Sequence, residues 1–561
     1  MRRPPSRPST IPAVKIPGGF ALRARPRSGF RRVTALTLVA AGLSALVPVA
    51  ALEAQDAEPF PLYRAGLGDL TRKVTTSVPE AQAYFDQGLQ LMYAFAKPEG
   101  LRSFQEASKA DPSCAMCAWG EAWGWGPYLN GPMRSEDEPA AHQAARRAAQ
   151  LAEVAGAATP VERALIDAIQ VRYAATAEEA QEGRRERDEV YARALAEVYQ
   201  RFPEDLDVGT AYGESLMLLE PRRGTWPLDK PSVQRIHRTL EEVLARDLSH
   251  PGACHLYIHA TESTPDAFKA EPCADLLGTS IPGASHINHM PSHTYNRIGR
   301  WSDAVRANQR AWHSDQKAAI GEGFAIYPSH NLHMLLFAAS MDGQGAVAVQ
   351  AGKDYGKIVP GGQFYHVLAL VRFGRFDEVL EVEERPEDPV FRGLWAFGRG
   401  YAHLRQARSD SARHYLAAMR EIVEQEPEAQ FRGHTTEQLL GVTAGILEGE
   451  LLRSEGAFGE ARATLEAAVA LEDDLRYDEP EPLNFSARHW LGNLLLQMDE
   501  PTEAEAVFRA ALRDHPDNGW SLFGLEASLR AQGRHGDAEL VRRTFDRSWE
   551  DADVWIRAAV F

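Results

Sequence analysis

The fold is decided by residues 84–112, which read YFDQGLQLMYAFAKPEGLRSFQEASKADP. Aromatic residues stand at Tyr84 and Phe104, and small residues stand at Gly88, Gly100 and Ala107. Apolar residues recur every three or four positions on either side of a proline-containing break, which is the helical period. Small residues at these positions let two antiparallel helices approach closely, and Phe104 fills the gap between them. The stretch therefore predicts a helical hairpin over 83–112.

The same spacing returns at the other end of the chain and, more loosely, between the two ends. The C-terminal copy has Gly492, Ala504, Phe508, Ala511 and Pro516 at the matching positions. Other registers include Gly449, Ala461, Leu465 and Ala468, with looser copies through Tyr295, Gly343, Gly374 and Trp520. Each hairpin can bury its apolar face only against its neighbours, so we expect an all-α fold, a right-handed α-solenoid of hairpins from about 80 to 555. Further hairpins are predicted over 286–316 and 486–516.

Composition excludes several classes of protein. The 561 residues are 44% hydrophobic and 25% charged, close to globular averages, which excludes a disordered chain, a collagen and a multi-spanning membrane protein. The formal net charge is -17, and nine of the 61 basic residues lie within the first 54, so the rest of the chain is more acidic still. Nucleic acids and anionic membranes carry the same sign of charge, so neither is expected as a partner.

The N-terminal segment has the order of a secretory signal. Residues 2–32 are basic, an apolar run follows from Val33 to Leu52, and Ala51 or Ala54 could precede a cleavage site. We therefore expect an exported protein, periplasmic or secreted, without a membrane span after signal removal; an uncleaved anchor is the alternative. The predicted divisions are a basic segment with the signal (1–54), an extension (55–79), N-terminal repeats (80–245), His-rich middle repeats (246–385) and C-terminal repeats (386–561).

Four cysteines form two sequence pairs. Cys254 and Cys273 flank one predicted hairpin, and we expect them close enough to form a disulfide, which an exported chain permits. Cys114 and Cys117 lie on one predicted helix as a CxxC pair. That pair fits a second metal site with soft ligands, a redox pair or two buried thiols, and the sequence does not choose among them.

The chain resembles the tetratricopeptide-repeat family. More narrowly, it is similar to a group of exported bacterial repeat proteins without a settled biochemical role. The resemblance is carried by YFDQGLQLMYAF (84–95), CAMCAWGEAWGWGP (114–127), HPGACHLYIHATEST (250–264), HINHMPSHTYNRIGR (286–300) and YPSHNLHMLLFAA (327–339). That group has Asn-His after the residue equivalent to Phe95, where this chain has Ala96-Lys97, so a role of that pair does not carry over. The resemblance implies the repeat fold and leaves the function open.

Histidines are concentrated in the middle repeats. Eleven of the 18 histidines lie between His237 and His366. In the repeat pattern, positions 2, 5 and 9 of the first helix form one stripe along the concave groove. His286, His289 and His293 occupy these positions in one repeat, and the next repeat places His330 and His333 at positions 2 and 5. Because neighbouring helices pack about 10 Å apart, imidazoles from both repeats could reach one ion.

This pattern predicts a transition-metal site in the groove, holding Zn, Cu or Fe. His255, His259 and Glu262 share a second helix face, because their spacing is i, i+4, i+7. The candidate ligands are His255, His259, His286, His289, His293, His330 and His333, with Glu214 or Glu262 as the carboxylate. Metal binding is expected to weaken as the pH falls through about 6.5, because a protonated imidazole has no lone pair to donate.

Two functions follow from these residues. A metal centre with an open position would suit a metal-dependent oxidase or hydrolase, although no residue identifies a substrate. The rival is a non-catalytic scaffold that binds a peptide, a protein or a small molecule in its groove, with the histidines lining that surface. The chain has no Walker loop, dinucleotide fingerprint or Gly-x-Ser-x-Gly elbow that would favour another enzyme class.

Overall fold

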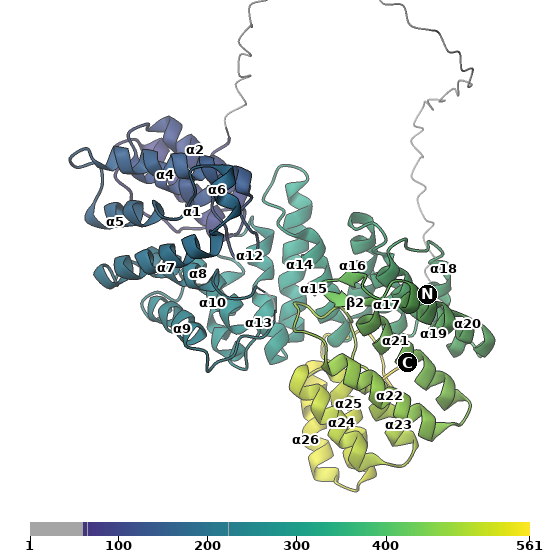
Figure 1. The fold of residues 1–561 in the computed structure, drawn as a ribbon. Coiled ribbons are helices and arrows are strands. Elements are labelled where there is room, and N and C mark those ends of the chain that lie inside the picture. The colour runs from purple at the N-terminus through teal and green to yellow at the C-terminus, as the bar shows by residue number, and fades with distance from the viewer. Residues whose placement is uncertain (1–59, 64, 223) are drawn as a thin grey trace, which may run out of the picture. The chain divides into compact units, whose positions relative to one another are not determined.

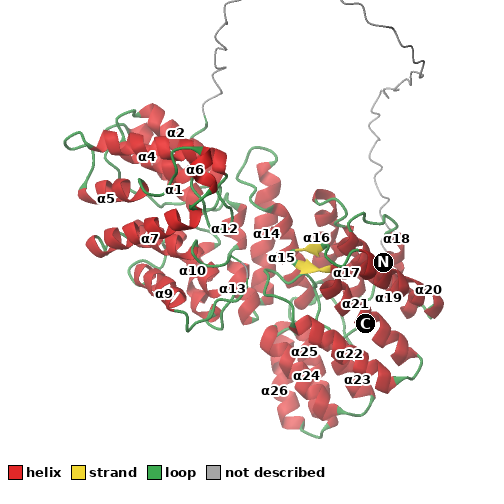
Figure 2. Cartoon of the chain, in the orientation of Figure 1, coloured by secondary structure: helices red, strands yellow, loops and turns green. Residues whose placement is uncertain are grey.

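The computed structural model describes residues 60–63, 65–222 and 224–561, so the predicted signal segment lies outside the described residues. The described chain is an α-solenoid of tetratricopeptide-like hairpins, as predicted (Figures 1 and 2). The N-terminal helices are α1 (Pro79–Tyr93), α2 (Lys97–Ala110), α3 (Ala115–Trp125), η1 (Ser135–Asp137), α4 (Glu138–Ala152), α5 (Pro160–Ile169), α6 (Ala177–Gln181), α7 (Arg184–Arg201), α8 (Leu206–Met217) and α9 (Pro231–Leu244).

The middle and C-terminal helices continue the same succession of short antiparallel pairs. The middle helices are α10 (Pro251–Thr261), η2 (Ala267–Ala270), α11 (Glu271–Leu277), α12 (Ser285–His289), α13 (Pro291–Ile298), α14 (Trp301–Ala318), α15 (Pro328–Met341), α16 (Gly345–Ile358), α17 (Gln363–Arg372) and α18 (Phe376–Glu381). The C-terminal helices are α19 (Pro389–Arg405), α20 (Ser409–Gln425), α21 (Thr436–Ser454), α22 (Phe458–Asp473), α23 (Arg488–Gln497), α24 (Pro501–Asp514), α25 (Gly519–Ala531) and α26 (His535–Ser548).

The predicted hairpin over 83–112 is formed by α1 and α2, and its packing explains the sequence pattern. Phe104 on α2 is fully buried between Gly88 of α1 and Gly120 of α3. A Cβ atom added to Gly88 would stand 2.7 Å from the Phe104 ring, and one added to Gly120 would overlap it. Phe508 on α24 repeats this arrangement with two glycines of α23 and α25. Glycine is therefore needed where the aromatic residue of a hairpin packs against the first helix of its own hairpin and against the first helix of the next one.

The predicted hairpin over 286–316 also forms, but its first helix is broken in two. Pro291 has no N–H to donate, so α12 ends at His289 and α13 begins at Pro291. The backbone nevertheless stays helical at Met290, whose φ and ψ are -50° and -38°. His286 and His289 of α12 and His293 of α13 therefore remain near one face of the interrupted helix.

A two-stranded hairpin is the exception to the all-helical expectation among the described residues. Strands β1 (Gln430–Phe431) and β2 (His434–Thr435) pair antiparallel. Arg432 and Gly433 between them both have positive φ, as the tight turn of a two-residue hairpin requires.

The C-terminal repeats pack back against the middle repeats. The indole N–H of Trp301 donates to the carbonyl of Pro516 at 2.8 Å, and that of Trp520 donates to the carbonyl of Ser340 at 2.9 Å. Asn484, in the connection between α22 and α23, donates to the Ser340 hydroxyl at 2.9 Å. In Figure 1 the yellow α24–α26 accordingly lie below the teal α13–α15. This return places residues 475–487 beside the His-rich repeats.

Cys254 and Cys273 form a disulfide, which confirms the prediction that they lie near each other. Their Cα atoms are 5.0 Å apart, and the bond joins α10 to α11. Because α10 also carries His255 and His259, the disulfide anchors the helix that supplies two of the candidate ligands.

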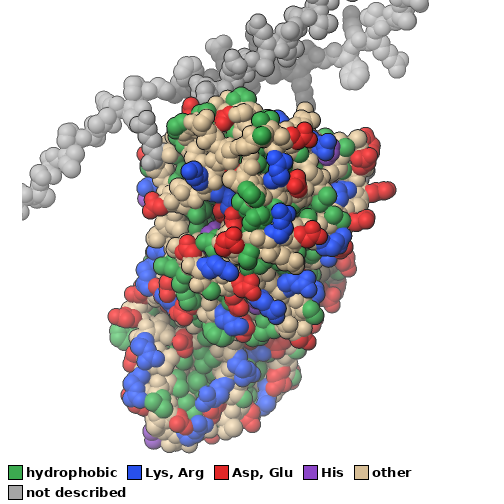
Figure 3. Space-filling view, turned by 90° about the vertical axis from the view of Figure 1, so that its left-hand side faces the viewer, with side chains coloured by type: hydrophobic (Ala, Val, Ile, Leu, Met, Phe, Trp, Pro, Cys, Tyr) green, Lys and Arg blue, Asp and Glu red, His purple; other side chains and the backbone are tan. Residues whose placement is uncertain are grey.

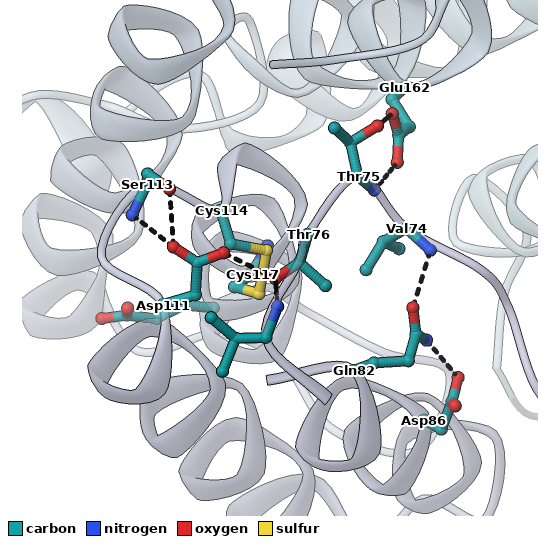
Figure 4. Close-up of a disulfide and its surroundings, with 12 residues drawn as sticks. Val74, Thr75, Thr76, Gln82, Asp86, Asp111, Ser113, Cys114, Cys117 and Glu162 are labelled. Carbon is teal, nitrogen blue, oxygen red and sulfur yellow. Dashed lines mark hydrogen bonds between the residues drawn. A yellow bond between two sulfur atoms is a disulfide. The ribbon is translucent and has the colours of Figure 1, made fainter. Parts of the chain in front are cut away.

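Cys114 and Cys117 form a second disulfide at the start of α3 (Figure 4). Both cysteines are buried. Beside them Asp111 accepts hydrogen bonds from the Thr76 hydroxyl at 2.5 Å and from the Ser113 hydroxyl at 2.6 Å. The two sulfur atoms are bonded to each other, so they do not form the soft-metal site considered from the sequence.

The surface of the described residues carries mixed charge. On the face in Figure 3, basic and acidic side chains are interspersed. None of the helices in the described part of the chain combines the length and the apolar character that a bilayer crossing requires.

Candidate metal centre

Six of the predicted histidines come together as two imidazole triads. The first triad is His255 and His259 of α10 with His286 of α12. The second triad is His289 of α12, His293 of α13 and His330 of α15. Within each triad, one nitrogen from every imidazole lies within 4.8 Å of the others. Nitrogens bound to one first-row metal at about 2.0–2.1 Å lie at comparable separations, so each triad has the dimensions of a metal site.

The two triads are adjacent. The rings of His286 and His289 have centroids 5.6 Å apart, and those of His259 and His293 are 5.3 Å apart. A third group of potential ligands, composed of His259, Glu262, His293 and Glu479, takes one histidine from each triad. The six imidazoles therefore form one continuous centre.

Glu262 connects the two triads. One of its carboxylate oxygens accepts from His259 Nδ1 at 2.7 Å, and the other accepts from His293 Nδ1. Glu262 caps the C-terminus of α10, three residues after His259, and is buried. The i, i+4, i+7 spacing predicts that His255, His259 and Glu262 share one helix face. In the structure Glu262 contacts the Nδ1 atoms of His259 and His293.

Four histidines have their Nδ1 atoms held by oxygen. Besides the two bonds to Glu262, His255 Nδ1 donates to the carbonyl of Tyr93 at 2.6 Å, and His289 Nδ1 donates to the Asn308 side-chain oxygen at 2.8 Å. A carbonyl or carboxylate oxygen only accepts, so the proton lies on Nδ1 and the lone pair of the neutral ring lies on Nε2. Oxygen bonds of this kind orient metal-binding imidazoles and increase their basicity.

The Nε2 atoms of these four histidines point into the centre. His289 Nε2 and His293 Nε2 are 2.7 Å apart, and His255 Nε2 lies 3.1 Å from His286 Nε2. His259 Nε2 is buried and has no hydrogen-bond partner among the described residues. Buried polar atoms are rarely left without a partner, so the inward nitrogen of His259 calls for a ligand.

The protonation of the centre is set by burial and by the carboxylates. Burial lowers the pKa of five imidazoles well below the ordinary value of 6.5, at His255, His259, His286, His289 and His330. Burial acts in the same direction on His293, but the charge of Glu262 and the hydrogen bond to it raise the pKa of His293 to about 9. Without metal, His293 therefore holds a proton at neutral pH and donates Nε2–H to His289.

Glu479 is a member of the centre that the sequence analysis missed. One of its oxygens accepts from Arg222 at 2.6 Å, and the other lies 3.6 Å from His293 Nδ1. Glu479 lies in the connection between α22 and α23, nearly 200 residues from His293 in sequence, and no helical spacing relates the two. Asn308 of α14 was missed as well, because it lies 19 residues from His289 and no spacing along one helix relates the two.

Two predicted ligands lie outside all three of these groups. His333 lies on α15, one helical turn after His330. Its Nε2 atom is 2.5 Å from the hydroxyl of Tyr365 on α17. Glu214 is buried on α8, where Arg172 and Lys97 are its charged neighbours. We therefore leave both residues out of the ligand set.

Two aromatic residues with strained backbones pack against the first triad. Phe95 and Tyr327 have φ of 59° and 57°, in the left-handed region. The Phe95 ring centroid is 4.2 Å from that of His255, and the Tyr327 ring stands edge-on to His286 at 5.2 Å. Such conformations cost about 1–3 kcal/mol each and persist where the surroundings enforce them, often at functional sites.

The centre is enclosed rather than open to solvent. Five of the six imidazoles are buried, and His330 is partly buried. Arg222 connects two covering segments, because it donates to Asn130 at 2.8 Å as well as to Glu479. A cavity of about 30 Å³ borders His293 and Glu479. A water molecule needs about 10–15 Å³, so this cavity has room for a small ligand beside the second triad.

Comparisons with known proteins concern the fold. No family model and no curated protein matches the chain. Among solved structures, the human IFIT1 dimer with m7Gppp-AAAA is 10% identical, with 86% of this chain and 92% of that chain covered and a TM-score of 0.29. The APC/C hetero-tetramer Cut9-Hcn1 is 10% identical over 83% of this chain and 76% of that chain, with a TM-score of 0.28. The P58(IPK) TPR domain is 11% identical over 81% and 98%, with a TM-score of 0.23. The helical-repeat assignment rests on the hairpins of the chain itself.

Proposed function

We propose that this protein binds a transition metal in the buried centre formed by the two imidazole triads and Glu262. The observation that carries the proposal is the orientation of four imidazoles, whose Nδ1 atoms are held by oxygen while their Nε2 atoms converge. A hydrogen-bonded core would not require an unpartnered Nε2 at His259. Bound metal would give these inward nitrogens a partner.

The ligand chemistry favours Zn, Cu or Fe over Mg or Ca. Imidazole suits the first group, whereas the second prefers oxygen ligands. A bound ion would act as a Lewis acid or a redox centre, and Glu262 would orient the histidines around it. The cavity beside His293 and Glu479 is suited to a water molecule or dioxygen. We therefore retain metal-dependent hydrolysis or oxidation as the reaction class for this site.

Export of the protein is part of the proposal. The N-terminal sequence has the order of a secretory signal, and both cysteine pairs are disulfide-bonded. Structural disulfides persist in oxidising compartments, so they support a periplasmic or secreted protein.

Metal content is the direct test of this function. The purified protein, exposed in turn to Zn(II), copper or iron and then freed of loose ions by gel filtration, is expected to retain at least one of these metals in a stoichiometric amount. Elemental analysis by mass spectrometry measures it. The same protein dialysed against a strong chelator is the reference. If no metal is retained from any of Zn, Cu or Fe, the imidazoles are not a metal centre and the scaffold function takes its place.

The pH dependence of metal binding follows from the pKa of His293. Between pH 8 and pH 6 the apparent affinity for Zn(II) is expected to fall about tenfold per pH unit, because the metal must displace the proton that His293 holds below about pH 9. The other five imidazoles have lowered pKa values and keep their lone pairs in this range. Calorimetry in buffers of different ionisation enthalpy should count about one proton released per chain when the second triad is filled. A pH-independent affinity without proton release would contradict this protonation scheme.

The rival function, a scaffold that binds a peptide, a protein or a small molecule, has a separate structural basis. A cavity of about 740 Å³ has none of the six imidazoles in its lining, which includes Arg310, His313 and Lys317 of α14 and Tyr63 of the N-terminal extension. Arg310 and Lys317 outnumber the one carboxylate of the lining, Glu322, so the cavity would suit an acidic ligand. A chain that retains no metal but binds such a ligand would favour this function.

A further inference from the structure

We infer that the centre holds two metal ions, one in each imidazole triad, an inference that rests on the proposed metal binding. The two triads share no residue: His255, His259 and His286 form one, and His289, His293 and His330 form the other. Three protein ligands and one open position are the usual composition of a catalytic transition-metal site. Each triad is therefore complete without the other.

One ion cannot use all six imidazoles. The ligand atoms of a triad lie within 4.8 Å of one another, and no group of ligand atoms that meets this limit contains both whole triads among the described residues. The ring centroids of His286 and His289 are 5.6 Å apart, so the triads stand side by side rather than around one point. A single ion in the second triad would leave the buried His259 Nε2 without a partner, whereas an ion in the first triad satisfies it.

The position of Glu262 also supports a pair of ions. Glu262 orients one histidine from each triad, His259 and His293, through its two oxygens. The same carboxylate therefore orients a ligand of each ion and offsets part of the charge of both.

The charge of the side chains around the triads determines which metal ion is the best probe for both sites. Two carboxylates, Glu262 and Glu479, and one guanidinium, Arg222, lie against the triads. The guanidinium of Arg432 also acts on His330 but is paired with Asp478, so the net charge is -1. Two monovalent ions would leave a single positive charge in this buried region, and two divalent ions would leave three. Uncompensated buried charge is costly, and copper is among the metals that imidazole ligates, so its monovalent form, Cu(I), is the probe for which both sites should fill most readily.

The experiment counts ions in the full chain and in single-triad variants. Wild-type protein loaded with Cu(I) under reducing but disulfide-sparing conditions is expected to retain about two ions per chain. His286→Gln alters only the first triad and His330→Gln only the second, so each variant should retain about one ion, and the double variant none. His333→Gln is the matched control, because His333 lies on the same helix as His330 but outside both triads, and it should retain two. Circular dichroism confirms that each variant is folded.

The outcomes separate this inference from the proposed function. Two ions in the wild type and one in each single variant support the pair. One ion in the wild type overturns the pair and leaves the metal-binding function standing. The same holds if either single variant loses both ions while remaining folded, because the triads would then act as one site. No retained ion from copper or zinc overturns both.

Discussion

Replacing His259 and His293 together with glutamine is expected to abolish metal binding, from stoichiometric occupancy to background. The double variant removes one imidazole from each triad, so neither triad retains three nitrogen ligands. Glutamine is chosen because its side-chain N–H can still donate to Glu262, which keeps the buried carboxylate partnered. An amide is a much poorer ligand for Zn, Cu or Fe than an imidazole. Elemental analysis after gel filtration gives the occupancy.

The matched control is the pair His333→Gln and His489→Gln. Both histidines are buried and hydrogen-bonded, to Tyr365 and to Ser521, and both lie outside the triads. This control should retain the wild-type metal content. The assignment of the centre is wrong if the control loses its metal while folded, or if the His259 and His293 variant keeps full occupancy.

Replacing Phe508 with alanine is expected to lower the free energy of unfolding of the C-terminal repeats by about 3–5 kcal/mol. The ring is fully buried and fills the space between α23 and α25 where their glycines leave room for it. The surrounding glycines have no side chains with which to close the cavity, so little relaxation can offset the loss. Urea unfolding followed by circular dichroism measures the change.

Phe268→Ala is the control for this substitution. Phe268 is 58% exposed, and its replacement should change the free energy of unfolding by no more than about 0.5 kcal/mol. A change at Phe508 as small as that at Phe268 would mean that the aromatic position of the repeat does not hold neighbouring hairpins together.

The fold could be predicted because its determinants are local and repeated. The glycine and phenylalanine positions of 84–112 and 488–516 each specify one hairpin, and stacking follows from the faces that the hairpins expose. Helical spacing likewise related His255, His259 and Glu262. The stripe positions of two successive repeats also related His289, His293 and His330. These relations need only the geometry of a helix and of its nearest neighbour.

The remaining members of the centre depend on contacts that no local pattern contains. Glu479 and Arg222 reach the histidines because the C-terminal repeats and the loop after α8 fold over them. His333 satisfies the same stripe rule as His330, yet one helical turn carries it to Tyr365 of the following hairpin. The stripe identifies a face of a helix, and the curvature of the solenoid decides which residues on that face share a centre.

The late position of Glu479 in the sequence has a consequence for the biosynthesis of the protein. Both triads are complete once His330 has been synthesised, whereas Glu479 follows about 150 residues later, roughly 8–30 s at ordinary rates of translation. The same order holds for a chain that crosses a membrane N-terminus first. During that interval the imidazoles can assemble on α10, α12, α13 and α15 without the segment that later covers them. Metal capture by the emerging chain can therefore precede closure of the centre, and the last repeats would then retain an ion that the middle repeats have already bound.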